Sequence, residues 1–290
     1  MSQTAILLSL AAAFIYAVAA IMLKRATAHG IGPWRVTFVT NWIQAIMFAP
    51  YWLLGGAPFT PEHLLHAAIC GACFFVGQIF TFLALSRGDV SIATPVLGTK
   101  IILVALFTSV LMAEPVTPAL WVAAVLTSIA TAMLGSTGRG NVSSFGVSIA
   151  YGFAAAVSYA LTDVFVQKWA RLWGFGHFAP AMFLTVGLLS LGLIPLFGGP
   201  LRVLPWRWLV PGAALLGVQA AALTYAIIVS GSATVTNVLY NSRGIWTVLL
   251  VWRLGHWFEN RESDHGTKIM RRRLLAALIL LTAIILAVRR

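Results

Sequence analysis

Charged residues are scarce in this sequence, and acidic residues are the scarcest. Only 9% of its 290 residues are charged, and just 7 are Asp or Glu. A soluble domain carries about 25% charged residues because its surface must face water. This chain cannot cover such a surface, and its mean hydropathy of +0.92 indicates that its solvent is lipid.

The sequence also lacks the motifs of common enzyme classes. It contains no Gly-rich phosphate loop, no cluster of metal ligands and no nucleophile placed with a base. Its two cysteines, Cys70 and Cys73, lie in an apolar run without a second pair, so we interpret them as packing residues rather than a redox or metal site. We therefore predict no enzyme activity, no catalytic residue, no metal and no cofactor. Without an ATP site, transport would depend on a gradient or on exchange.

Basic residues outnumber acidic ones and give a formal net charge of +12. In a soluble protein this charge would suggest binding to nucleic acid. Here Lys and Arg residues flank long apolar runs, as they do at a membrane surface. The expected partners are therefore a lipid bilayer and a small-molecule solute, with no nucleic acid. We expect a monomer or a homodimer.

Ten apolar segments are candidates for crossing a bilayer. A helix needs about 20 apolar residues to span the hydrocarbon core, and turns such as Gly55–Pro58 separate the segments. We predict an all-α membrane protein with ten transmembrane helices, multi-pass in the inner cell membrane. The segments are Ala5–Leu23, Val36–Leu54, Leu64–Ser86, Val90–Met112, Ala119–Leu134, Phe145–Trp169, Phe178–Phe197, Leu209–Ser230, Ser232–Leu254 and Leu274–Val288.

The chain divides near its middle. A Gly- and Ser-rich stretch at 135–144 separates five predicted helices over 1–134 from five over 145–290. Because five is odd, the second half must enter the membrane from the opposite face. We therefore predict two inverted five-helix repeats, an architecture in which the solute site lies near the midplane.

Weak internal similarity supports the division into repeats. Ser9–Val18 and Ser148–Val157 are identical at five of ten positions. A gap-free alignment of the fourth segment with the ninth places Lys100 opposite Arg243. The paired basic residues are the stronger support, because short apolar segments match easily by chance.

The architecture and one motif resemble a known family. The stretch Gly88–Pro95, followed by Glu114 in a chain of five plus five helices, resembles an EamA-type member of the drug/metabolite transporter superfamily. The resemblance implies export or exchange of amino acids and related metabolites, and distant relatives carry nucleotide sugars and triose phosphates. The second half departs from the pattern, because it has His256–Arg261 where family members have a Glu and a Gly-rich turn after the ninth helix.

Two basic residues lie deep inside predicted helices. Lys100 is near the middle of the fourth segment and Arg243 near the middle of the ninth. A charge at mid-bilayer costs about 2.5–3.5 kcal/mol on insertion scales. Two such cations would repel each other, so we predict that both bind an anionic or zwitterionic solute between them. The resemblance agrees, because triose-phosphate transporters also place basic residues in these two helices. The alternative is internal neutralisation, for which Asp163 is the only acidic candidate in a helix.

Asp163 lies in the later part of the sixth segment, which places it nearer an interface than the basic pair. It is a candidate for proton coupling, because burial and nearby cations change the protonation of a carboxyl group. It is equally a candidate for a static partner of Lys100 or Arg243, or for a residue facing water at the helix end.

The ninth segment is unusually polar for a helix that contacts lipid. Asn237 and Asn241 recur at helical spacing and form a polar face beside Tyr240. We expect this face to line the cavity, with interhelical hydrogen bonds as the alternative. Trp246 lies three residues past Arg243 and is a candidate for stacking on the solute, although anchoring at the interface is the commoner role of Trp.

Further polar residues lie on the second and third segments. Asn41 and Gln44 share one helical face, and Gln78 and Thr81 share another. Packing between helices is the simpler interpretation of each residue. We retain Gln78 as a candidate solute contact.

These features predict a secondary transporter, an exporter or exchanger that works by alternating access. The expected solute is a small polar metabolite, anionic or zwitterionic, such as an amino acid, an organic acid or a phosphorylated compound. Coupling to protons or to a counter-solute is expected. The alternative is a lipid-phosphate flippase or an intramembrane enzyme in which the basic pair holds an anionic headgroup.

The orientation in the membrane has two opposed indications. In the connections and at the ends of the predicted helices, four Lys and Arg residues lie on the side of the termini and 13 on the opposite side. The positive-inside rule then places both termini outside the cytoplasm. The family resemblance implies both termini inside.

Overall fold

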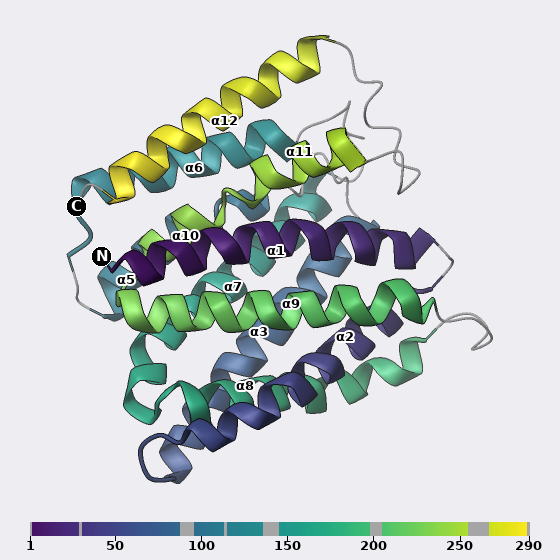
Figure 1. The fold of residues 1–290 in the computed structure, drawn as a ribbon, viewed down its shortest axis with the longest axis vertical. Coiled ribbons are helices and arrows are strands. Elements are labelled where there is room, and N and C mark those ends of the chain that lie inside the picture. The colour runs from purple at the N-terminus through teal and green to yellow at the C-terminus, as the bar shows by residue number, and fades with distance from the viewer. Residues whose placement is uncertain are drawn as a thin grey trace.

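A computed structural model describes residues 2–28, 31–87, 96–112, 115–135, 145–197, 205–254 and 267–288. Within those ranges the regular structure is helical, and the helices pack side by side in one bundle (Figure 1). The helices are α1 Gln3–Ala28, α2 Pro33–Phe48, η1 Ala49–Leu54, α3 Pro61–Arg87, α5 Lys100–Leu111, α6 Pro118–Gly135, α7 Phe145–Trp173, α8 Phe175–Ser190, η3 Leu191–Leu196, α9 Trp206–Ser230, α10 Ala233–Tyr240, α11 Arg243–Leu254 and α12 Thr267–Val288.

The prediction of an all-α membrane protein is confirmed. Each of the ten predicted segments contains helix in its described part. Five helices are long and apolar enough to cross a membrane by length and composition, and three shorter apolar helices accompany them. The Gly88–Pro95 motif, Glu114 and His256–Arg261 lie outside the described residues, as does most of the 135–144 stretch.

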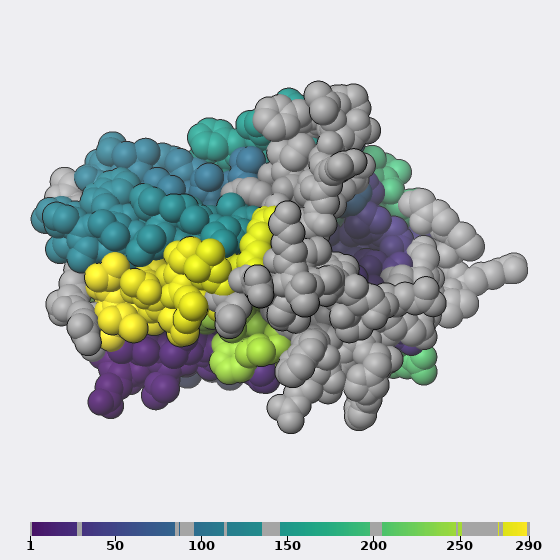
Figure 2. Space-filling view, turned by 90° about the horizontal axis from the view of Figure 1, so that it is seen from above, coloured from purple at the N-terminus to yellow at the C-terminus, as the bar shows by residue number. Residues whose placement is uncertain are grey.

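Both chain ends lie at the same end of the bundle (Figure 1). The last helix, α12, lies on the outside of the bundle against α6 (yellow and teal in Figure 2). Its outer face exposes a row of large apolar side chains, as lipid contact requires. This row consists of Leu275, Leu278, Leu281 and Ile285.

Small residues bring the helices into close contact. α1 packs against α9, α10 and α11, and several of its alanines are completely buried, among them Ala12, Ala13 and Ala17. Small side chains are typical of helix interfaces in membranes because they let backbones approach. Gly77 serves this purpose between α3 and α7, since a Cβ atom there would lie 2.8 Å from the Tyr159 ring. Gly77 therefore allows the Tyr159 ring to approach the backbone of α3 closely.

The fourth and ninth predicted helices are interrupted, whereas the sequence suggested continuous ones. A turn at Thr99 separates the short helical stretch 96–98 from α5, and a turn at Asn241 and Ser242 separates α10 from α11. Small polar side chains compete with the helical hydrogen bonds, and the Thr99 hydroxyl donates to the Val96 carbonyl at 2.7 Å. Lys100 and Arg243 therefore each begin a helix rather than occupy the middle of one.

The last turns of α7 hold three neighbouring helix ends. Lys168 Nζ donates to the carbonyl of Leu111 at 3.3 Å, where α5 ends. Arg171 Nε donates to the carbonyl of Ile228 at 2.9 Å, in the last turn of α9. Gln167 Oε1 accepts from the backbone N–H of Ala233 at 2.7 Å, where α10 begins. We call these residues of α7 the α7 clamp.

Candidate solute-binding site

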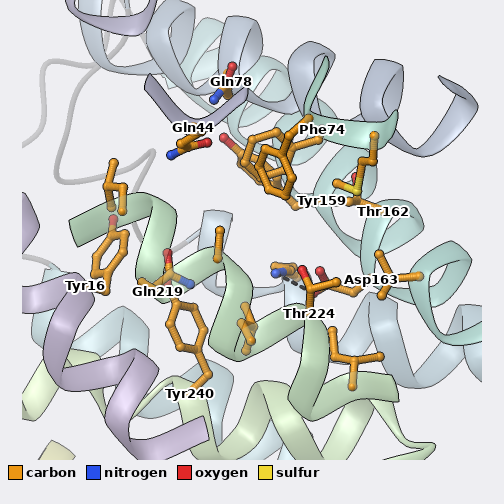
Figure 3. A pocket seen from close by; sticks show the side chains of 18 of the residues that line it. Tyr16, Gln44, Phe74, Gln78, Tyr159, Thr162, Asp163, Gln219, Thr224 and Tyr240 are labelled. Atoms are coloured by element: carbon orange, nitrogen blue, oxygen red, sulfur yellow. Dashed lines mark ion pairs between the residues drawn. The ribbon is translucent and has the colours of Figure 1, made fainter. Parts of the chain in front are cut away.

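A cavity of about 340 Å³ lies inside the bundle. Side chains of α1, α2, α3, α5 and α7 to α11 line it, and Figure 3 shows several of them converging on one space. A second cavity of about 230 Å³ adjoins it between α1, α5, α6 and α10. We call the first the central cavity and the second the side cavity. The two share six lining residues, which are Tyr16, Thr81, Leu97, Lys100, Tyr240 and Arg243.

Lys100 and Arg243 line both cavities, which together we call the chamber. The two residues that the sequence alignment paired therefore face one chamber, although they belong to helices far apart in the chain. The interruptions before α5 and α11 contribute to this placement, because each basic residue directly follows a turn that lies beside the chamber.

Asp163 neutralises Lys100. The Lys100 Nζ atom lies 2.6 Å from Asp163 Oδ2, and both side chains are largely buried. Asn237 Nδ2 donates to the same Oδ2 atom at 2.7 Å and to the Ala233 carbonyl at 2.9 Å. Asp163 thus lies beside Lys100 at the chamber, and the expectation that it sits nearer an interface than the basic pair was wrong. The polar face of α10 reaches α7, so Asn237 serves the hydrogen-bond network as well as the side cavity.

Arg243 has aromatic rather than acidic neighbours. Its guanidinium carbon lies 4.6 Å from the Tyr16 ring centroid and 4.8 Å from that of Tyr240. One guanidinium nitrogen donates to the Tyr240 hydroxyl at 3.2 Å. Within the described part of the chain no carboxylate pairs with it. Cation–π contacts hold the guanidinium over the rings without neutralising its charge.

Tyr16 is a site residue that the sequence analysis missed. It lines both cavities and its ring packs edge-to-face on Tyr240, with centroids 5.9 Å apart. It is the only residue with a phenolic hydroxyl in α1. A polar aromatic side chain inside an Ala-rich stripe was the signal that could have revealed it.

Asn241 and Tyr240 lie where the polar face of the ninth segment was expected to lie. Both are buried and line the side cavity, and Tyr240 also lines the central cavity. The Asn241 carboxamide donates to the Thr131 hydroxyl of α6. Asn241 therefore connects the turn between α10 and α11 to a neighbouring helix.

Trp246 does not join the other candidates. Its side chain is 37% exposed, packs against Phe14 and is absent from the lining of both cavities. Spacing along a helix placed it near Arg243, but the ring turns to the outside of the bundle. Contact of Trp246 with a solute in the chamber is not supported.

Gln78 lines the central cavity, but its carboxamide is already paired. Gln78 Nε2 donates to Asn41 Oδ1 at 2.9 Å, and Asn41 Nδ2 donates to Gln78 Oε1 at 3.0 Å. This reciprocal pair joins α3 to α2, as expected for polar residues between membrane helices. Gln78 thus has a packing role even where it faces the cavity.

Gln44 and Gln219 lie on the same cavity with unpaired carboxamides. They are 3% and 7% exposed and come from α2 and α9. Neither hydrogen-bonds to another residue in the described ranges, and Gln44 Oε1 is fully buried without a partner. Gln44 was expected to have a packing role, and Gln219 was not among the predicted site residues. Glutamine within an apolar segment was the available signal.

The remaining wall of the central cavity is apolar. Phe74 of α3 and Phe183 of α8 pack edge-to-face at 5.9 Å, and Met182 lies beside them. Leu216 and Leu223 of α9 continue this wall. The chamber therefore combines a polar region around Arg243 and the glutamines with a region suited to hydrocarbon.

Comparison with known proteins identifies the first half of the chain. Residues 3–136 match the EamA-like transporter family. No curated protein matches the sequence. One solved protein crystal structure aligns over 100% of this chain and 99% of its own, with a TM-score of 0.78 and 20% sequence identity. At this identity the likeness concerns the fold alone.

The family match covers α1 to α6, which carry Tyr16, Gln44, Gln78 and Lys100. The resemblance of the sequence to this family is thereby confirmed. EamA-like proteins are membrane transporters rather than enzymes. With its apolar helices and a polar cavity inside the bundle, this chain is a multi-pass membrane protein whose residues 3–136 are similar to the EamA-like transporter family.

Proposed function

We propose that the chain is a secondary transporter that moves a small anionic or zwitterionic solute across the inner cell membrane by alternating access. The solute occupies the central cavity. Two inverted five-helix repeats, 1–134 and 145–290, rock about the solute and expose it to one side of the membrane and then to the other. Such a cycle depends only on different affinities of the solute for the two states.

The paired helix interruptions support the repeat arrangement. α5 and α11 each begin at a basic residue directly after a turn, and the alignment of the fourth and ninth segments makes these residues equivalent. Discontinuous helices near the midplane are typical of solute sites between inverted repeats. The first turn of each helix also contributes a partial positive charge that favours an anion.

The unpaired charge of Arg243 is the observation that carries the proposal. Asp163 neutralises Lys100, so the described cavity residues keep one positive charge, on Arg243. A bare charge at mid-bilayer costs about 2.5–3.5 kcal/mol on insertion scales. An acid group bound to Arg243 offsets this cost, and the planar guanidinium can bind it through two parallel hydrogen bonds.

Uptake of radiolabelled organic anions into proteoliposomes tests this proposal. We expect Arg243→Gln to reduce uptake at least tenfold, because a charge-assisted hydrogen bond contributes about 1.5–3 kcal/mol. Lys100→Gln should reduce uptake as well, since it leaves Asp163 buried without its cation.

Arg207→Gln is the matched control. Arg207 lies at the start of α9, is exposed and is not among the residues that line the chamber. Its variant should transport like the wild type. Unchanged uptake in both Arg243→Gln and Lys100→Gln would remove the basic pair from the site.

A further inference from the structure

The central cavity contains two carboxamides that have no hydrogen-bond partner among the described residues. Gln44 and Gln219 belong to different helices, yet both side chains reach the space that Arg243 also lines (Figure 3). Each side chain is more than nine-tenths buried, and neither hydrogen-bonds within the described ranges. Buried polar groups in proteins almost always have a partner. The Gln44 Nε2 group and the Gln219 carboxamide are therefore free to bind a group that enters the cavity.

Other carboxamides of the bundle contrast with this pair. Gln78 is bonded reciprocally to Asn41, and Gln167 accepts from the Ala233 backbone. Gln residues that hold helices together thus have visible partners in the fold. Of these four glutamines, only Gln44 and Gln219 have no hydrogen-bond partner in the described ranges. Both project into the central cavity, where no amide lies beside them.

The charges of the cavity restrict what those carboxamides can receive. Among the described residues that line the cavity, Asp163 is the only carboxylate, and its Oδ2 atom already binds Lys100 and Asn237. A solute ammonium group would have to share this carboxylate, whose charge Lys100 already neutralises. A carboxamide offers a neutral acceptor and a neutral donor, which match a hydroxyl or an amide.

We infer that the central cavity selects monoanions that carry a neutral hydrogen-bonding group, either a hydroxyl or an amide. Arg243 binds the acid group, Gln44 and Gln219 bind the neutral group, and the wall around Phe74 and Phe183 receives the apolar remainder. This inference rests on the proposed function and refines its solute from anionic or zwitterionic to a hydroxylated or amidated monoanion.

Two matched series of acids test the selection. The first series is propionate, lactate and alanine, and the second is 3-phenylpropionate, 3-phenyllactate and phenylalanine. Within each series the members differ only in carrying hydrogen, hydroxyl or ammonium on the same carbon atom. Binding to the purified full chain in detergent is followed by intrinsic tryptophan fluorescence and by thermal shift. We expect the hydroxy acid of at least one series to bind at least tenfold more tightly than the other two members.

Variants of the carboxamides assign the selection to residues. Gln44→Leu and Gln219→Leu should each reduce the preference for the hydroxy acid to less than threefold while the affinity for the unsubstituted acid stays within twofold. Gln78→Leu removes a carboxamide of the same cavity that Asn41 already occupies, so it should lower the melting temperature and retain the preference.

The outcomes separate this inference from the proposed function. Equal affinity for hydroxy and unsubstituted acids, or tighter binding of the amino acids, overturns the selection by Gln44 and Gln219 and leaves the anion site at Arg243 intact. Parallel loss of affinity for every acid in the two Leu variants also overturns it, because the glutamines would then only support the fold. Binding of none of the six compounds contradicts the anion site itself.

Discussion

At the scale of single residues, Asp163 connects parts of both halves of the chain. Its Oδ2 atom receives the ammonium of Lys100 from α5 and the carboxamide of Asn237 from α10. A proton on this carboxylate would remove the charge that holds Lys100. The cavity would then carry two positive charges instead of one, which favours loading of an anion.

Asp163→Asn should therefore abolish proton coupling. We expect an imposed pH gradient to drive anion uptake into proteoliposomes of the wild type and to have no effect in the variant, because a carboxamide takes up no proton. Solute counterflow without a gradient should persist. The comparison variant is Glu62→Gln, which changes an acid that is 77% exposed near the end of the bundle and should retain the response. A normal response in Asp163→Asn would make Asp163 a static partner of Lys100.

Single site residues can be predicted from the sequence where a polar side chain lies in an apolar segment. Lys100, Arg243, Asp163 and Asn237 are polar residues in apolar runs, and the structure places all four around one chamber. The packing of α5, α7 and α10 decides which of these residues bind each other. A single sequence carries no information about that packing.

Other residues show why part of the site could not be predicted. Gln44 and Gln78 have the same chemistry and comparable positions in apolar segments, yet Asn41 faces only Gln78. Trp246 and Tyr240 lie at similar distances from Arg243 along the chain, but only Tyr240 turns inward. Pairing of side chains and rotation of a helix about its axis are tertiary properties.

At the scale of helices, the contact of α3 with α7 determines the position of the Tyr159 ring in the central cavity. Tyr159 lies with its ring centroid 5.8 Å from Lys100 Nζ and packs on Phe74 at 5.6 Å. Gly77 makes this possible, because its missing side chain leaves room for the ring.

Gly77→Ala should push α3 away from α7. A Cβ atom 2.8 Å from the ring must displace it, and overpacking of this kind costs about 1–3 kcal/mol. We expect a lower melting temperature and weaker anion binding in the same variant, measured by thermal shift and by tryptophan fluorescence. Gly146→Ala is the matched control, since its Cβ atom would meet nothing within 4 Å. Wild-type stability and affinity in Gly77→Ala would show that the interface adapts without moving Tyr159.

The positions of helices were more predictable than their continuity. Apolar length and Gly- or Pro-rich turns located all ten segments, and the helix bounds agree within a few residues for most of them. The interruptions at Thr99 and at Asn241 and Ser242 were not foreseen, because these residues occur in continuous membrane helices as well. Support from outside the helix matters here: Ser128 of α6 donates to the Gly98 carbonyl at 3.0 Å and thereby satisfies a group beside the break.

At the scale of the whole molecule, the two chain ends lie at one end of the bundle, as expected for the ten predicted crossings (Figure 1). The sequence predicts that basic residues concentrate at the other end, with 13 in connections and helix ends there against four on the side of the termini. Charge asymmetry of this size usually determines orientation.

A C-terminal reporter fusion measures this orientation directly. The charge distribution predicts that both termini lie outside the cytoplasm, so a reporter that is active only in the cytoplasm should be inactive. The same reporter fused after residue 135, at the opposite end of the bundle, should be active. The reverse result would show that the family arrangement prevails over the charges.

In the proposed cycle, we expect the α7 clamp to affect the rate of transport rather than the choice of solute. Gln167 and Arg171 lie one to two turns beyond Asp163 on the same helix, about 6–12 Å along its axis, and fasten the ends of α9 and α10. In a rocking transporter these fastenings must release each time the chamber opens toward the termini. Evolution can therefore adjust turnover by strengthening or loosening three hydrogen bonds, and the groups that recognise the cargo stay untouched.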